Sequence, residues 1–225
     1  DMYIVVFVAL MLLSMIVSYR LNSKFKQYSK TLLQGNLTGK DIAEKMLRDH
    51  DVLGVSVQCT EGFLTDHYDP TRKIINLSKE VYYGNNISAA AVAAHETGHA
   101  IQHAEAYSWL TLRTKLVPIV NFSSRWITWI LLAGVLLINV FPNLLLIGII
   151  LFATTTLFSF VTLPVEINAS SRAINWLENV VTYEQLPKAK HALKLAAYTY
   201  VIAALSSLAT LLHYVMIFLG NSDED

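Results

Sequence analysis

The chain has 225 residues, of which 54% are hydrophobic and only 15% are charged. Soluble domains carry about 25% charged residues, so this deficit, together with long apolar runs, indicates a membrane protein. The formal net charge is zero, and no basic stretch with interleaved aromatic residues points to a nucleic-acid partner. The single cysteine, Cys59, cannot form an internal disulfide, which fits a reducing compartment.

The first apolar run, residues 2–19, contains no charged side chain. It is long enough for one membrane helix, which needs about 17–25 residues. A cleaved signal peptide would carry positive charge before the run and a small-residue cleavage site after it. Here Asp1 precedes the run and basic residues follow it, beginning with Arg20. We therefore predict a retained transmembrane helix over residues 1–19.

Residues 20–115 form a polar region, which we expect to contain the catalytic part of the protein. Thr38 followed by Asp41 resembles a capped helix start, and amphipathic spacing follows it. Residues 54–60 and 72–77 are rich in β-branched residues and bounded by turn signals, so they predict a small hairpin or sheet. An edge strand there is a candidate for holding a substrate backbone by strand addition, beside a purely structural role.

The next segment, residues 89–104, reads AAAVAAHETGHAIQHA and predicts a helix with Ser88 as its N-cap. It contains the pattern H-E-x-x-H, which is typical of zinc-dependent peptidases. His95 and His99 lie four residues apart, on one face of a helix, where both can bind one zinc ion. Glu96 lies beside them, where its carboxylate can take a proton from a metal-bound water. The alternative is a helix in which two histidines occur by chance.

A second apolar block, residues 116–163, is interrupted by a polar, proline-containing turn at 139–143 and predicts a hairpin of transmembrane helices 2 and 3. Pro164 is expected to end the third span. Three segments complete the chain: a polar helical region at 164–196, a fourth span at 197–219 and an acidic tail at 220–225. The expected fold is a mainly α membrane protein with four transmembrane helices and a zincin-like α+β catalytic region.

The distribution of basic residues predicts the orientation in the membrane. All 17 Lys and Arg residues fall in the stretches 20–125 and 172–194, whereas the turn at 139–143 and both termini have none. Positive charge near spans marks the cytoplasmic side. We therefore expect a multi-pass protein of the inner (plasma) membrane, with both termini outside and the zinc helix in the cytoplasm at the membrane surface.

A catalytic zinc site needs three protein ligands and one open position. A third histidine six residues after His99 would complete one known pattern, but that position holds Glu105. His103 is too far along a straight helix to reach the same ion as His95. Glu166 is the better candidate, because it follows the third span at the same expected surface. Its alternative role is an ordinary surface carboxylate in the first turn of a helix.

Several motifs resemble one known family. The segments HETGHAIQHAEAYSWLTLRTKLVP, LPVEINASSRA and TDHYDPTRKIINLS are similar to the YugP-type family of bacterial membrane zinc metallopeptidases. The arrangement is also broadly similar to the HtpX-type and Ste24-type membrane peptidases, which are gluzincins. The resemblance covers roughly residues 20 to 200. It implies that His95, His99 and Glu166 are metal ligands and that Glu96 is the general base.

The chain departs from the gluzincin pattern behind the ligands. Where gluzincins often have an aspartate four residues after the glutamate ligand, this chain has Ser170, and the nearest analogue is Asn168. Arg172 is a candidate for stabilising an oxyanion or for neutralising nearby carboxylates. His67 and Tyr68 are further oxyanion candidates, with packing or turn roles as alternatives.

The expected function is that of a zinc endopeptidase acting on membrane or juxtamembrane polypeptides, with Zn²⁺ as cofactor and the lipid bilayer as partner. An intramembrane protease of the site-2 type would need an LDG motif, which does not occur in this chain. A non-catalytic, zinc-stabilised membrane scaffold is the alternative from another class. The sequence leaves a homo-oligomer open.

Overall fold

The computed structural model describes residues 2–222 and divides into two compact units. The first unit comprises Asp1–Met15, Thr111–Leu163 and Thr199–Asp225. The second comprises Ile16–Leu110 and Pro164–Tyr198 and contains the sheet and the H-E-x-x-H helix.

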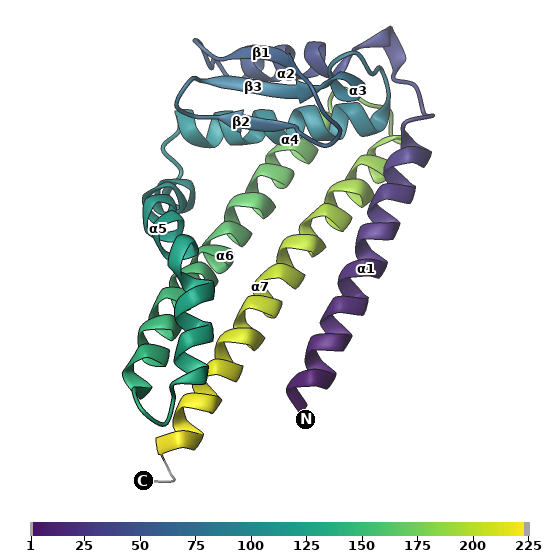
Figure 1. The fold of residues 1–225 in the computed structure, drawn as a ribbon. Helices are drawn as coiled ribbons and strands as arrows, with labels where there is room; N and C mark the ends of the chain where they lie inside the picture. The colour runs from purple at the N-terminus through teal and green to yellow at the C-terminus, as the bar shows by residue number, and fades with distance from the viewer. Residues whose placement is uncertain (1, 223–225) are drawn as a thin grey trace. The chain divides into compact units, whose positions relative to one another are not determined.

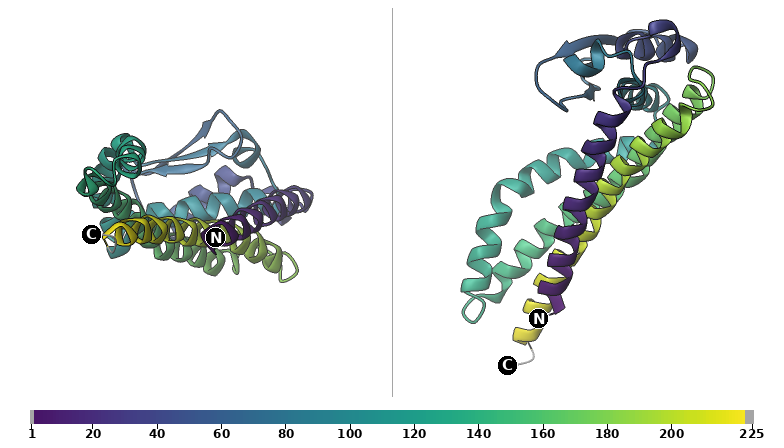
Figure 2. Two further views of the ribbon diagram at one scale, coloured as in Figure 1. Left: turned by 60° about the horizontal axis from the view of Figure 1, so that its bottom comes forward. Right: turned by 90° about the vertical axis from the view of Figure 1, so that its right-hand side faces the viewer.

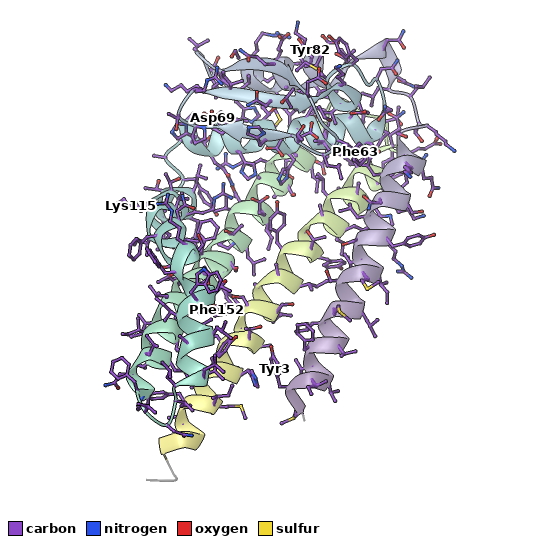
Figure 3. All side chains as sticks on the ribbon, viewed as in Figure 1. Tyr3, Phe63, Asp69, Tyr82, Lys115 and Phe152 are labelled. Carbon is purple, nitrogen blue, oxygen red and sulfur yellow. The ribbon has the colours of Figure 1, made fainter. Side chains whose placement is uncertain are left out.

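Four helices are long and apolar enough to cross a membrane among the residues that the structure describes. They are α1 (Met2–Tyr28), α5 (Ser108–Leu136), α6 (Pro142–Leu177) and α7 (Leu186–Ser222), drawn in Figure 1. Figure 3 shows the side chains that project from them, with Tyr3 on α1 and Phe152 on α6 labelled. The mainly α membrane fold is therefore confirmed.

Small and hydroxylated residues bring the helices of the first unit together. A Cβ added at Gly134 on α5 would lie 2.7 Å from the Leu145 Cα on α6, so the two backbones approach closely there. Thr154 Oγ1 donates to Ser123 Oγ at 3.0 Å, and the Thr156 and Ser207 hydroxyls lie 2.7 Å apart. These hydrogen bonds satisfy polar groups within apolar helices.

Three of the long helices extend beyond the spans predicted from the sequence. The first helix continues past residue 19 to Tyr28. The third span was expected to end at Pro164 and a polar helix to follow it; in the structure the two are one helix, α6, which runs through Pro164 to Leu177, as membrane helices often do when neighbouring groups satisfy the freed carbonyl. The fourth long helix begins at Leu186, so Pro187 lies in its first turn, where no N–H is needed. Of the predicted tail 220–225, the first three residues belong to α7 and 223–225 lie outside the described residues.

The predicted strands form a sheet rather than a simple hairpin. The strands β1 (Ser56–Thr60), β2 (His67–Asp69) and β3 (Ile74–Ser78) have the order β1-β3-β2. The two strands predicted from the sequence, β1 and β3, pair in parallel, with Ser56 opposite Ile74. The short strand β2 pairs antiparallel with β3, with Tyr68 opposite Ile75, and forms one edge of the sheet.

The helices α2 (Gly39–Asp49) and α4 (Ile87–Ala104) pack against each other and against the sheet (Figure 2). The shorter elements η1 (Gln34–Asn36) and α3 (Lys79–Tyr82) connect them to their neighbours. The predicted capping box begins α2: the Thr38 hydroxyl accepts from the Asp41 N–H, and the Asp41 carboxylate accepts from the Thr38 N–H. The core between the two helices and the sheet is fully buried and includes Ile42, Met46, Ile75, Leu77, Ile87 and Ile101.

Candidate metal centre

Helix α4 positions the histidine pair. Its N-cap is Asn86, whose side chain accepts a hydrogen bond from the Ala89 N–H, and not the predicted Ser88. Ser88 is buried and donates to the Phe25 carbonyl at 2.6 Å. One turn apart on α4, the rings of His95 and His99 have centroids 4.8 Å apart. The spacing in the sequence therefore puts both imidazoles on one face, as predicted.

Gly98 lies where the backbones of α4 and α6 come close together. A Cβ built on it would lie 2.7 Å from the carbonyl oxygen of Ala169, which is shorter than van der Waals contact. Only a residue without a side chain fits here, which explains a glycine in mid-helix despite its cost of about 1 kcal/mol relative to alanine. The close approach brings the face of α6 that carries Glu166 to the two histidines.

The three side chains predicted as ligands lie together. Glu166 Oε2 lies 3.0 Å from His95 Nε2 and 3.4 Å from His99 Nε2. His95, His99 and Glu166 are the cluster of metal-binding side chain types found among residues 2–222, with one ligand atom from each within 4.8 Å of the others. Two ligands about 2.0–2.1 Å from a tetrahedral ion lie about 3.3 Å apart. The residues therefore fit zinc in type and in spacing.

The second nitrogen of each ring has its own partner. The Nδ1 atom of His95 lies 3.0 Å from Ser170 Oγ, and that of His99 lies 3.0 Å from Gln102 Oε1. Both Nε2 atoms are thereby directed toward Glu166. Asn168 was named from the sequence as the nearest analogue of the supporting aspartate, but within residues 2–222 its side-chain oxygen accepts from Gln102 and Arg172 and not from a ring nitrogen. Ser170, at the aspartate's own position, makes that contact instead.

Gln102 was not identified from the sequence. It is fully buried, and its Nε2 donates to the Val165 carbonyl and to Asn168 Oδ1, both at 2.9 Å. It lies three residues after His99, so the two share a helix face, and this spacing is the signal that could have revealed it.

The centre combines a buried carboxylate with two partly buried imidazoles. The Glu166 side chain is only 6% exposed, while those of His95 and His99 are 15% and 10% exposed. Burial lowers the pKa of His99, but its hydrogen bond to Glu166 and the negative charges of Glu96 and Glu166 outweigh burial and raise that pKa above its usual value. A buried carboxylate facing two imidazoles therefore favours binding of positive charge.

Glu96 lies next to this cluster on α4 and is half-buried. Within the described part of the chain its carboxylate has no hydrogen bond or ion pair. Burial raises the pKa of Asp66 above its usual value, and the negative charge of Glu96 adds to this rise. Hydrogen bonds from the backbone and side chain of Ser78 lower the pKa but do not cancel the rise. Asp66 immediately precedes β2, so the start of this edge strand lies within electrostatic range of Glu96.

Comparison with known proteins agrees with this geometry. Residues 3–219 match the family described as "Putative neutral zinc metallopeptidase". The chain belongs to this family. It is also 43% identical to the "Putative membrane protease YugP" of Bacillus subtilis (strain 168), over the full length of both chains. No solved structure matches it. The resemblance to the YugP-type family is therefore confirmed, and family membership supports a protease role with zinc as its metal.

The remaining predicted site residues have other partners. Arg172 Nη1 forms an ion pair with Glu105 at 2.7 Å, and its Nε donates to Asn168 Oδ1 at 2.7 Å. The hydroxyl of Tyr68 lies 2.9 Å from His103 Nδ1. His67 is exposed, and its Nδ1 lies 2.8 Å from the Thr65 carbonyl oxygen. Arg172 was considered for stabilising an oxyanion or for neutralising a nearby carboxylate; in the structure it pairs with the carboxylate of Glu105.

Proposed function

We propose that this member of the zinc metallopeptidase family is a membrane-embedded endopeptidase of the gluzincin type. Its ligands are His95, His99 and Glu166, and its general base is Glu96. The observation that carries the proposal is the convergence of two imidazole nitrogens and one buried carboxylate from α4 and α6, next to a second carboxylate that has no partner among the described residues.

The residues divide the chemistry between them. A zinc ion held by the three ligands would supply Lewis-acid activation of water and of the scissile carbonyl. Glu96 takes a proton from the attacking water and passes it to the nitrogen of the leaving amine, so the peptide bond is hydrolysed to a carboxylate and an amine. Ser170 and Gln102 hold the two imidazoles in orientation. His67 and Tyr68 stay candidates for stabilising the oxyanion.

Strand β2 supports a mode of substrate binding. It forms one edge of the sheet and contacts α4. It begins next to Asp66, whose pKa is raised in part by the negative charge of Glu96. The edge not paired with β3 presents backbone N–H and C=O groups to which an extended polypeptide can add as a strand. We propose that the substrate backbone binds along this edge.

The proposed substrates are membrane or juxtamembrane polypeptides, cleaved at the cytoplasmic face of the plasma membrane. The support is the basic charge of the stretches 20–125 and 172–194, set against a turn at 139–143 that has none. The site residues belong to the unit formed by Ile16–Leu110 and Pro164–Tyr198, so the proposal places this unit in the cytoplasm.

The test is Glu96→Gln, which keeps the size of the side chain but removes its basicity. We expect purified Glu96→Gln protein to retain zinc in stoichiometric amount. Membranes from cells producing it should lack the new protein N-termini that the wild type generates, measured by N-terminal proteomics. Glu80→Gln, an exposed glutamate on α3, is the matched control and should behave as wild type. Equal sets of new N-termini from wild type and Glu96→Gln would favour the zinc-stabilised scaffold and end the enzyme proposal.

A further inference from the structure

A chain of hydrogen bonds joins Arg172, near the surface, to the buried ring of His99. The guanidinium Nε of Arg172 donates to Asn168 Oδ1 at 2.7 Å, and Gln102 Nε2 donates to the same oxygen at 2.9 Å. The other end of the Gln102 amide, Oε1, lies 3.0 Å from His99 Nδ1. Gln102 is 0% exposed, so water cannot replace any of its partners.

The chain has a fixed direction because two of its members, the Arg172 guanidinium and the Val165 carbonyl, can each play only one role in a hydrogen bond. An arginine side chain has only donors, so Asn168 must turn its oxygen toward Arg172. Gln102 must then present its NH₂ group to that oxygen. The same NH₂ group also faces the Val165 carbonyl oxygen at 2.9 Å, which can only accept. Both observations orient the Gln102 amide in the same way.

The orientation of Gln102 determines the tautomer of His99. Because Oε1 of Gln102 can only accept, the hydrogen bond to His99 requires a proton on Nδ1. The lone pair of the neutral ring is then on Nε2, the atom that faces Glu166 at 3.4 Å. His95 differs, because its Nδ1 contacts the Ser170 hydroxyl, which can donate or accept and imposes no tautomer.

We propose that Gln102 is a positioning residue for the metal, oriented by Arg172 through Asn168, and that it holds His99 in the Nδ1–H tautomer. Arg172 is itself held by the ion pair with Glu105 at 2.7 Å. The inference rests on the proposed zinc site. It adds that His99 is preset for metal binding by a neutral network of amides.

The test measures metal binding by the purified full chain in detergent. Zinc affinity is determined by competition with a chromogenic chelator, and the visible spectrum of the Co²⁺-loaded protein reports ligand geometry. Gln102→Met keeps the volume but removes the acceptor, and we expect about 10–100-fold weaker zinc binding and a changed Co²⁺ spectrum. Gln102→Glu keeps an acceptor for Nδ1–H but loses the NH₂ group that donates to Val165 and Asn168, so it should bind zinc more tightly than Gln102→Met and less tightly than wild type.

The matched control is Ser88→Ala, which removes another buried hydrogen bond from the same helix, to the Phe25 carbonyl. It should lower the thermal midpoint of unfolding without changing zinc affinity. If Gln102→Met matches Ser88→Ala in both measurements, Gln102 is merely structural and the inference is overturned. Wild-type protein that fails to bind zinc would instead overturn the proposed function, so the two failures are distinguishable.

A second pair of variants tests the direction of the network while leaving Gln102 in place. Asn168→Asp keeps an oxygen that accepts from both Gln102 and Arg172, so we expect zinc affinity within about threefold of wild type. Asn168→Leu removes that oxygen and leaves the Gln102 amide held by the Val165 carbonyl alone, so affinity should fall by about tenfold. Equal affinities for these two variants would contradict the inference, including in the case where Gln102→Met does not fold.

Discussion

Helices α4 and α6 can lie as close as they do because Gly98 has no Cβ atom. We predict that Gly98→Ala destabilises the protein by about 1–3 kcal/mol, because a Cβ would lie 2.7 Å from the Ala169 carbonyl oxygen and backbone cannot yield cheaply. The same displacement should move Glu166 away from the histidines and weaken zinc binding. Thermal unfolding in detergent and chelator competition measure the two effects.

Gly220→Ala is the control for this prediction, because Gly220 lies on α7 with nothing within 4 Å of the added Cβ. It should leave zinc affinity unchanged and should not lower the thermal midpoint, since alanine favours a helix over glycine. If Gly98→Ala binds zinc as wild type does, the metal centre does not depend on the close approach of the two helices.

Spacing in the sequence predicts that the two histidines share a helix face, but it does not predict the partners of their Nδ1 atoms. The spacing of His95 and His99 within one helix is set by 3.6 residues per turn, so their shared face follows from the pattern. The partners of their Nδ1 atoms come from how α4 crosses α6, which no spacing within one segment determines. For this reason Asn168 was expected as the supporting residue, whereas Ser170 and Gln102 make the contacts.

At the scale of the element, the capping box of α2 gives a pH-dependent prediction. The hydrogen bond from the Thr38 N–H is the main cause that lowers the pKa of Asp41 below its usual value of 3.8. Because the folded pKa is lower than the unfolded one, ionised Asp41 stabilises the fold fully above the unfolded pKa. This stabilisation is lost as the pH falls through the folded value.

We therefore expect Asp41→Asn to be less stable than wild type at pH 7, by about 0.5–1 kcal/mol. The difference should shrink once the pH falls below about 4, since the asparagine does not titrate. Thermal midpoints of both proteins at pH 7, 5, 4 and 3, all in excess chelator so that zinc binding does not contribute, measure this. A gap that is constant over this range would mean that the charge of Asp41 is irrelevant to the cap.

Element types were easier to predict than element partners and ends. The Thr38 and Asp41 pair marked the start of α2 because a capping box is a local interaction. The strands at 54–60 and 72–77 were recognised from composition, but their parallel pairing depends on β2 lying on the far side of β3. The sequence predicted a span up to Pro164 and a helical segment after it, but not that both belong to one continuous helix, because packing can outweigh one lost backbone hydrogen bond.

At the scale of the whole molecule, the distribution of charge makes a prediction about orientation. The 17 basic residues fall within 20–125 and 172–194, so the unit that contains the sheet should face the cytoplasm and the turn at 139–143 should face outside. The wild-type chain contains a convenient reporter for this: Cys59, its single cysteine, is exposed on β1.

We expect a membrane-impermeant maleimide to label Cys59 in inverted membrane vesicles and not in intact cells. In a Cys59→Ser background, Asn139→Cys places the reporter in the exposed turn between α5 and α6, and the pattern should reverse. The Cys59→Ser protein without a new cysteine is the control for background labelling. Labelling of both positions from the same side would contradict an orientation set by positive charge, and labelling of Cys59 from outside would move the proposed proteolysis to the opposite face of the membrane.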